Sequence, residues 1–243
     1  MRRPTHPVIF LALLAALLLS DIPLAFAETV GSPSSILKKG KWVMGLAGGG
    51  TPGREMSGDA ETTITHGAHY RGYGLSDRLS VYLKLGAAYL EIDDPAIKKT
   101  NDLDTTNSFG TNFMTGLALK AKLFESTKYR WEWDGSLQYL DLRQRHKDKN
   151  ELRWHEWQLT TSVAKEFGRV KPYLGVKVAM VNAFYRVRQQ GRLLQQGRYK
   201  EKSRLGLFLG TDCALGDSED VILNLETAYQ DGPEVAVSLA YVF

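Results

Sequence analysis

The chain has 243 residues, and 31 Lys and Arg against 27 Asp and Glu give it a formal net charge of +4. An excess this small, scattered along the sequence, does not favour a nucleic-acid-binding protein. Cys213 is the only cysteine, which excludes an intramolecular disulfide and any fold held together by disulfides.

The N-terminal segment has the three parts of a secretory signal peptide. Two arginines precede an almost purely apolar run over residues 8–19, and Ala25 and Ala27 occupy the small-residue positions before the expected cleavage site. The apolar run is shorter than the roughly 20 residues that a membrane-spanning helix needs. We therefore predict a signal peptide over residues 1–27 and an exported mature chain over residues 28–243.

The mature chain repeats one unit, in which about ten residues of alternating character are followed by a break rich in turn residues. The breaks are alternately short, as at 75–78, and long or polar, as at 48–61, 93–107 and 189–200. Tight turns at one end and longer loops at the other are typical of a transmembrane β-barrel. We predict ten strands, with eight or twelve as alternatives, near 41–47, 62–74, 79–92, 108–124, 129–145, 152–167, 172–188, 201–215, 221–230 and 234–243.

Segment 129–141 alternates most clearly. Its odd positions are Tyr129, Trp131, Trp133, Gly135, Leu137 and Tyr139, whereas its even positions are Arg130, Glu132, Asp134, Ser136 and Gln138. Successive side chains of a strand point to opposite faces, so one face is apolar and the other is largely ionic.

Aromatic residues mark both ends of the apolar face in several predicted strands. The pairs are Trp131 and Tyr139, Trp157 and Phe167, and Tyr173 and Phe184. Two aromatic girdles around an apolar band are expected where lipid meets water, and the strand lengths suit a tilted membrane span. A soluble β-sandwich also has alternating strands. It does not account for the girdles or for the charges on the opposite face, so we favour the barrel.

The last ten residues carry a resemblance to a known family. Val235, Val237, Leu239, Tyr241 and Phe243 share one face, and Phe243 ends the sequence. This pattern resembles the C-terminal signature of bacterial outer-membrane β-barrel proteins, a small porin-like barrel being the nearest kind.

The resemblance implies an all-β fold, a transmembrane antiparallel up-and-down β-barrel located in the cell outer membrane. Its surroundings would be outer-membrane lipid and lipopolysaccharide. Tyr241 and Phe243 would form the assembly signal that the barrel-assembly machinery recognises. We expect a monomer whose two termini face the periplasm.

The inward faces of the predicted strands gather charges of both signs. We expect these charges to form a network of ion pairs in the lumen, because a small barrel is nearly filled by side chains and an unpaired buried charge costs several kcal/mol. The predicted network consists of Lys84, Lys120, Lys122, Arg130, Glu132, Asp134, Glu156, Glu166, Lys177, Arg204, Asp212 and Glu226. The expected role is structural or porin-like with a plugged lumen, and a narrow selective channel is the alternative.

An enzyme is the rival of a different class. Outer-membrane proteases of the omptin type are also ten-stranded, and acidic pairs and an Asp–His pair line their extracellular rim. Here Asp93 and Asp94 follow the third predicted strand, His146 and Asp148 follow the fifth, and His155 begins the sixth. The spacing departs from the omptin pattern and the chain is shorter. We therefore expect no enzyme, no cofactor and no metal site.

The long basic break at 189–200 suggests a third role, adhesion or lipopolysaccharide binding by the loops. Arginine and lysine side chains there are candidate ligands for lipopolysaccharide phosphates. The alternative is an exposed hairpin that its charges keep soluble. The candidates are Arg192, Arg198, Lys200 and Lys202, with Arg186 and Arg188 just before them.

Overall fold

The computed structural model describes residues 36–94, 107–145, 151–189 and 192–243; the predicted signal peptide lies outside these ranges. Within them the chain forms one antiparallel sheet. Its strands are β1 (Trp42–Glu55), β2 (Glu61–Ser76), β3 (Leu79–Asp93), β4 (Asn107–Ser126), β5 (Trp131–Arg145), β6 (Glu151–Lys165), β7 (Val170–Gln189), β8 (Arg192–Tyr199), β9 (Leu205–Leu215), β10 (Val221–Tyr229) and β11 (Pro233–Val242).

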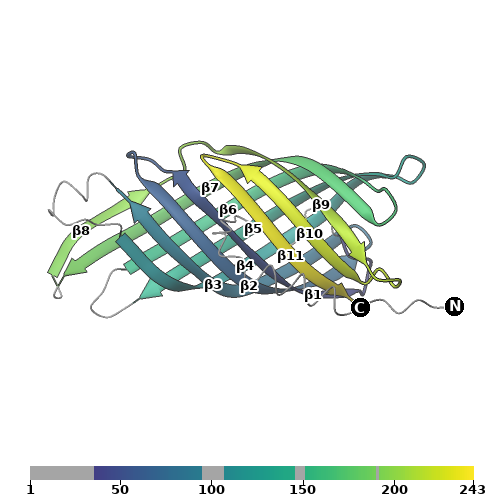
Figure 1. The fold of residues 1–243 in the computed structure, drawn as a ribbon, viewed down its shortest axis with the longest axis horizontal. Helices are drawn as coiled ribbons and strands as arrows, with labels where there is room; N and C mark the ends of the chain where they lie inside the picture. Colours follow the sequence, from purple (N-terminus) through teal and green to yellow (C-terminus); the bar gives the residue numbers. More distant parts are fainter. Residues whose placement is uncertain (1–35, 95–106, 146–150, 190–191) are drawn as a thin grey trace.

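The sheet closes on itself into a barrel of ten strands (Figure 1). Consecutive strands are neighbours, and the pairings of β1 with β11 and of β6 with β7 complete the ring. β8 is not one of the ten strands that close the barrel. It pairs only with the last part of β7, whereas β9 pairs with the first part. The predicted ten-stranded, all-β, up-and-down barrel is confirmed. No helix in the described ranges is long and apolar enough to cross a membrane.

The two ends of the barrel differ, and we name them for what they carry. At the turn end, Trp42 N donates to the carbonyl oxygen of Phe243 at 2.9 Å, so the first and last strands start and stop together. The tight turns between β2 and β3, β4 and β5, β6 and β7, and β9 and β10 lie at the same end. The loop end holds the β7–β8 hairpin, the last residues of β3 and β5 and the first residues of β4 and β6 (Figure 1).

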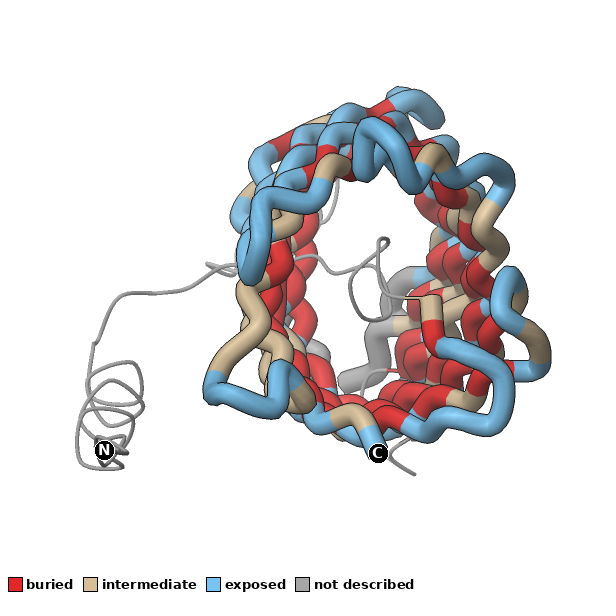
Figure 2. Tube along the Cα trace, turned by 90° about the vertical axis from the view of Figure 1, so that its right-hand side faces the viewer, coloured by how far each residue is buried: buried red, intermediate tan, exposed pale blue. Residues whose placement is uncertain are grey.

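Along each strand, buried and exposed residues alternate around the ring (Figure 2). The exposed positions are apolar over the middle of the barrel, as at Leu117, Leu159 and Leu207, whose exposed fractions are 54, 58 and 59%. A closed sheet with apolar side chains on its outside exposes far more contiguous apolar surface than a soluble monomer does. Hydrocarbon is the surroundings that such a surface requires, which excludes the β-sandwich.

Several strands are longer than the sequence predicts. β1 runs on to Glu55 and includes Gly48–Gly50, which we expected to begin a loop, and the expected loop at 189–200 is a hairpin of β7 and β8. β7 has 20 residues, whereas a tilted strand crosses a bilayer with roughly 9–11. Ladder pairing continues beyond the membrane thickness wherever a partner strand is present, and local composition does not reveal that partner.

Glycines on the inner face make room for aromatic rings of the neighbouring strand. A Cβ atom on Gly45 would lie 2.5 Å from Cζ of Tyr70, and one on Gly72 would lie 2.5 Å from Cε1 of Tyr82. Both rings are almost fully buried. Gly45 and Gly72 are therefore packing residues of the barrel interior.

Candidate functional site

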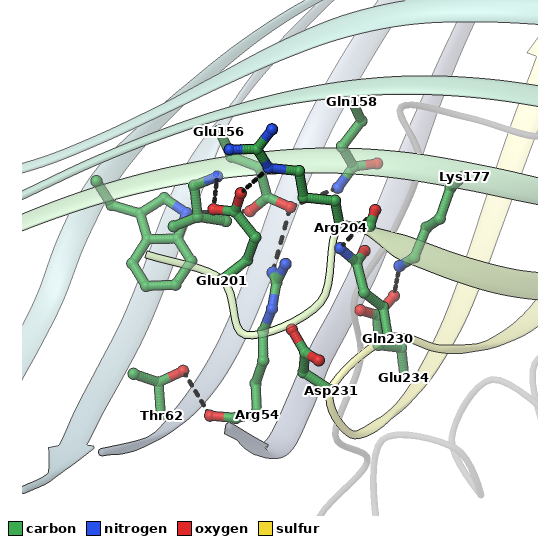
Figure 3. Close-up of polar contacts among 12 residues, drawn as sticks. Arg54, Thr62, Glu156, Gln158, Lys177, Glu201, Arg204, Gln230, Asp231 and Glu234 are labelled. Atoms are coloured by element: carbon green, nitrogen blue, oxygen red, sulfur yellow. Dashed lines mark hydrogen bonds and ion pairs between the residues drawn. The ribbon is translucent and has the colours of Figure 1, made fainter. Parts of the chain in front are cut away.

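An ion pair crosses the lumen from wall to wall. Arg54 of β1 and Glu156 of β6 are five strands apart in either direction around the ten-stranded ring. Nη1 of Arg54 donates to Oε1 of Glu156 at 3.2 Å, and both side chains are at least 95% buried (Figure 3). Trp154 Nε1 and Gln158 Nε2 also donate to the Glu156 carboxylate, at 3.0 and 2.8 Å. The pair is thus held by hydrogen bonds as well as by charge.

A second pair joins Lys177 of β7 to Glu234 of β11 (Figure 3). Nearby, Gln230 Nε2 donates to the carbonyl oxygens of Ser203 and Arg204, at 3.0 and 3.2 Å. Near the loop end, polar contacts therefore join opposite walls at Arg54 and Glu156 and strands three apart at Lys177 and Glu234.

An apolar cluster fills the interior beside these pairs. It includes Leu90, Ile92, Met114, Leu142 and Trp154, each 0% exposed. All five point inward from β3, β4, β5 and β6 and are removed from solvent.

Polar groups occupy the half of the lumen nearer the turn end. Glu132 is bound by two lysines from strands on either side, Lys122 at 3.5 Å and Lys171. Lys120 Nζ lies 4.6 Å from the centroid of the Tyr82 ring. Each of these three inward-facing lysines therefore has a carboxylate or an aromatic ring as its partner, which offsets the cost of taking its charge out of water.

A second polar group in this half centres on Tyr173, which donates to Glu226 at 2.8 Å. Asn224 Nδ2 donates both to the Tyr173 hydroxyl and to Asp212, each at 2.8 Å. Tyr173 is 4% exposed and faces inward. The prediction that Tyr173 belongs to an outer girdle is therefore wrong, because residues 173 and 184 differ in parity and lie on opposite faces.

The chain preceding β1 covers part of the turn end. The backbone nitrogen of Leu37 donates to the Ser80 hydroxyl at 2.9 Å, and the Leu37 side chain packs with Tyr70 and Tyr82. Lys39 N donates to Asp77 at 3.1 Å. These contacts anchor the segment ahead of β1 against β2 and β3.

At the loop end, residues 200–204 pass over the short β10–β11 hairpin and close the wall against β1. We call them the crossing segment. Glu201 forms a β-bridge with Met56, accepts from Val181 N at 2.8 Å and accepts from Arg204 Nε at 3.0 Å (Figure 3). Asp231 Oδ2 accepts from the backbone of residues 202 and 203. The crossing segment therefore links three separate parts of the rim.

Nine of the twelve predicted lumen residues lie on the inner face. Seven of them are at most 7% exposed, and the side chains of Lys122 and Glu132 are 14 and 16% exposed. Asp134 differs from the rest, since its carboxylate oxygens are buried without a hydrogen-bond partner among the described residues. The nine are Lys84, Lys120, Lys122, Glu132, Asp134, Glu156, Lys177, Asp212 and Glu226.

The other three predictions are wrong, because Arg130, Glu166 and Arg204 lie outside the strands. Arg130 and Glu166 belong to adjacent turns at the turn end, 3.8 Å apart and at least half exposed, and Arg130 has a left-handed φ of 54°. The Arg204 side chain is 68% exposed and reaches Glu201 in the crossing segment. Alternation assigns a face only while the ladder lasts, and the ladder ends one or two residues short of each of them.

Several residues of the lumen contacts escaped the sequence prediction, four of them near the loop end. Arg54 falls in a stretch expected to be a loop, and Glu201 and Gln230 belong to connections at the rim. Glu234 could have been found, because it has the inward parity of the last strand, opposite to Val235.

The predicted lipopolysaccharide contacts do not form one cluster. Lys202 turns across the rim to Glu55, with Nζ 2.7 Å from Oε2, whereas Arg198 packs over Phe184 on the outer face. Lys200 is exposed, and the side chain of Arg192 lies outside the described part of the chain. The hydrogen bond from Lys202 to Glu55 raises the pKa of the lysine above its usual value.

The residues of the rival enzyme hypothesis are also separated. Asp94 accepts from the Tyr199 hydroxyl inside the rim, whereas His155 lies on the outer face, with Nδ1 2.8 Å from both Asp141 Oδ1 and the Tyr139 hydroxyl. His146 and Asp148 lie outside the described residues. No group of three or more potential metal ligands occurs among the described His, Cys, Asp and Glu residues.

Tyr241 and Phe243, the expected assembly signal, both lie on the outer face at the turn end. Each is 48% exposed, and their rings stack with centroids 6.0 Å apart.

The closed antiparallel ring, its apolar exterior and its largely polar interior define a class. The chain is a transmembrane β-barrel of the outer-membrane type.

Comparison with known proteins adds solved structures of similar fold. Neither the family models nor the curated proteins contain a match. The translocator domain of the autotransporter NalP from Neisseria meningitidis is 9% identical, with a TM-score of 0.48, 87% of this chain covered and 91% of that one. The outer-membrane protease OmpT from Escherichia coli is 8% identical, with a TM-score of 0.45 and coverages of 87% and 100%. OprG from Pseudomonas aeruginosa is 11% identical, with a TM-score of 0.41 and coverages of 86% and 98%. Likeness at this level transfers no residue, ligand or activity to this chain.

Proposed function

We propose that this chain is a structural barrel of the outer membrane whose lumen is closed to ions and small solutes. The turn end faces the periplasm and the loop end faces outward. The observation that carries the proposal is the Arg54–Glu156 pair, which joins opposite walls inside the barrel.

Two features near the loop end support a lumen that is closed to solutes. A solute passing the Arg54–Glu156 pair would have to separate two charges that are buried away from water, and breaking such a pair costs about 3–5 kcal/mol. It would then meet the apolar cluster around Leu90, whose aliphatic members Leu90, Ile92 and Leu142 offer no hydrogen bonds to replace those of the solute's water.

A narrow selective channel is the second candidate, and one observation favours it. Arg54 Nε and Nη2, Glu234 Oε1 and both Asp134 oxygens are buried without a hydrogen-bond partner among the described residues. Buried polar atoms of this kind are usually satisfied by internal water. A continuous file of such waters would conduct small ions, whereas isolated waters would not.

Liposome swelling separates the two candidates. Proteoliposomes carrying the parent protein should not swell in solutions of arabinose or of potassium chloride. The variant R54S/E156S/W154A removes the crossing pair and the largest apolar side chain beside it, and it should admit both solutes. The matched control K202S/E55S removes an ion pair at the rim and should stay closed. Swelling by the parent in arabinose would refute closure, and swelling in salt alone would favour the selective channel.

We also propose that the protein is not catalytic. The outward position of the Asp141–His155 pair, away from the rim residues Asp94 and Tyr199, supports this, because no acidic pair faces it across the barrel mouth within the described residues. Peptide and phospholipid hydrolysis by the purified parent and by H155A should both stay at background. Activity that H155A abolishes would contradict the proposal.

A further inference from the structure

We propose that an outward-facing row of arginines on β5 to β8 binds the phosphate groups of lipopolysaccharide. We call it the arginine row. The ladder register places Arg143 opposite Arg153, Arg153 opposite Phe184, and Phe184 opposite Arg198, so the three arginines follow one another across four adjacent strands. Arg186 lies one outward position further along β7.

The row lies just beyond the aromatic end of the apolar band. Tyr139 and Trp157 are opposite one another with ring centroids 4.7 Å apart, and the outer face is apolar on the turn-end side of them. Arg143 and Arg153 are each four residues further toward the loop end. Four residues of a strand rise about 13 Å, and strand tilt reduces the height to roughly 10 Å. That is the depth of lipid headgroups, next to the level where aromatic belts lie.

The row has more positive than negative charge. Asp141 lies 2.7 Å from Arg143, and Glu151 is shared by Arg153 at 2.9 Å and Arg186 at 3.3 Å. Four guanidinium groups, counting Arg198, therefore meet two carboxylates. Arg143 and Arg153 also face one another directly across the ladder, an arrangement of like charges that destabilises a sheet unless an anion lies between them.

The arginines are accessible to a ligand in the plane of the membrane. The side chains of Arg143 and Arg153 are 68 and 51% exposed. Arg186 and Arg198 lie over the Phe184 ring, with Cζ atoms 4.9 and 5.9 Å from its centroid. Two guanidinium groups therefore lie within 6 Å of one ring, and each is a planar fork that can contact phosphate oxygens through two hydrogen bonds.

Lipopolysaccharide fits the row better than a free phosphate does. Four residues from the row toward the turn end, Trp157 and Met180 expose apolar side chains, at 47 and 51%, that acyl chains of the same molecule would cover. A ligand with several phosphates and acyl chains would satisfy the guanidinium groups and the apolar surface together. The assignment takes from the proposed function only the outward orientation of the loop end, and it does not depend on whether the lumen is closed.

Binding of lipid A to the purified, detergent-solubilised barrel tests the proposal. The probes are bis-phosphorylated lipid A, the same lipid A after dephosphorylation, and phosphatidylglycerol, each followed by native mass spectrometry. The variant R153Q/R198Q removes two charges from the row. The matched control R130Q/R169Q removes two exposed arginines at the turn end. A second row variant, R143Q/R186Q, provides an independent measurement should the first fold poorly.

We expect the parent to prefer bis-phosphorylated lipid A, and each row variant to bind it at least about tenfold more weakly, the loss of one or two charge-assisted hydrogen bonds. The control should match the parent. Unchanged binding by both row variants would overturn the proposal. So would equal binding of dephosphorylated lipid A, which would leave only acyl-chain contacts, or equal binding of phosphatidylglycerol, which would point to anionic lipid in general.

Discussion

Arg54 and Glu156 meet in the interior from opposite walls of the barrel, with Nη1 and Oε1 3.2 Å apart and both side chains buried. Because β1 and β6 lie on opposite sides of the ring, this contact spans the cross-section of the lumen instead of joining neighbouring strands. The paired side chains also occupy the middle of the lumen, which in an open pore would be filled with water.

Removing one partner of this pair should cost far more stability than removing both. We expect R54A or E156A alone to lower the free energy of unfolding by about 3–5 kcal/mol, because the remaining charge stays buried, and the double variant to lower it by clearly less. Urea titration of the barrel folded in vesicles measures all three. Additive losses in the double variant would show that the two side chains do not interact.

Trp154 should behave as a core residue although it belongs to a membrane barrel. It is 0% exposed within the apolar cluster, and W154A should lower the free energy of unfolding by about 3–5 kcal/mol by leaving a cavity. The matched control is W157A on the same strand, whose side chain is 47% exposed on the outer face. Equal losses in both variants would argue against a packed interior.

Gly45 should not tolerate a side chain, since an added Cβ would lie 2.5 Å from Cζ of Tyr70 and 2.7 Å from the carbonyl oxygen of Leu239. We expect G45A to destabilise the barrel by about 1–3 kcal/mol through overpacking. G67A on β2 has nothing within 4 Å of the added Cβ and should be close to neutral. If the ring is the cause, adding Y70L to G45A should recover part of the loss in the same urea titration.

Much of the architecture follows from period-two alternation, but its limits follow from tertiary pairing. The segment from Trp131 to Tyr139 sorts its two faces by parity alone, and the structure agrees there. Arg130 has the correct parity yet lies in a turn, because nothing in local composition states where the ladder begins. The β7–β8 hairpin and the end of β1 pair with strands that follow directly in the sequence, but their turn-rich or polar composition predicts loops.

The lumen was only partly predictable, since alternation tells which side chains point inward but not which ones meet. Glu156 was expected inside, whereas its partner Arg54 comes from a stretch read as a loop. The apolar character of the loop-end interior was also missed. Leu90 and Leu142 sit at inward parity, but the prediction assumed that the inner face is ionic throughout.

The Lys202–Glu55 pair at the rim gives a pH-dependent signature. Its hydrogen bond raises the pKa of the Lys202 ammonium, so whatever stability the pair contributes is present below the usual lysine pKa and is lost as pH rises through the raised value. Nitrogen-detected NMR titration of the lysine should give a pKa above that of an exposed lysine, and E55Q should return it to the ordinary value. An identical titration in E55Q would show that the pair does not persist in solution. Because both side chains are more than half exposed, high salt should also weaken the effect.

Single-channel recording across a planar lipid bilayer tests closure of the lumen most directly. With the purified parent protein inserted, in molar potassium chloride and with voltage applied in both directions, we predict current indistinguishable from that of the bare bilayer. Stable, stepwise conductance that appears on insertion of the parent would contradict a lumen closed by the Arg54–Glu156 pair and the apolar cluster beside it.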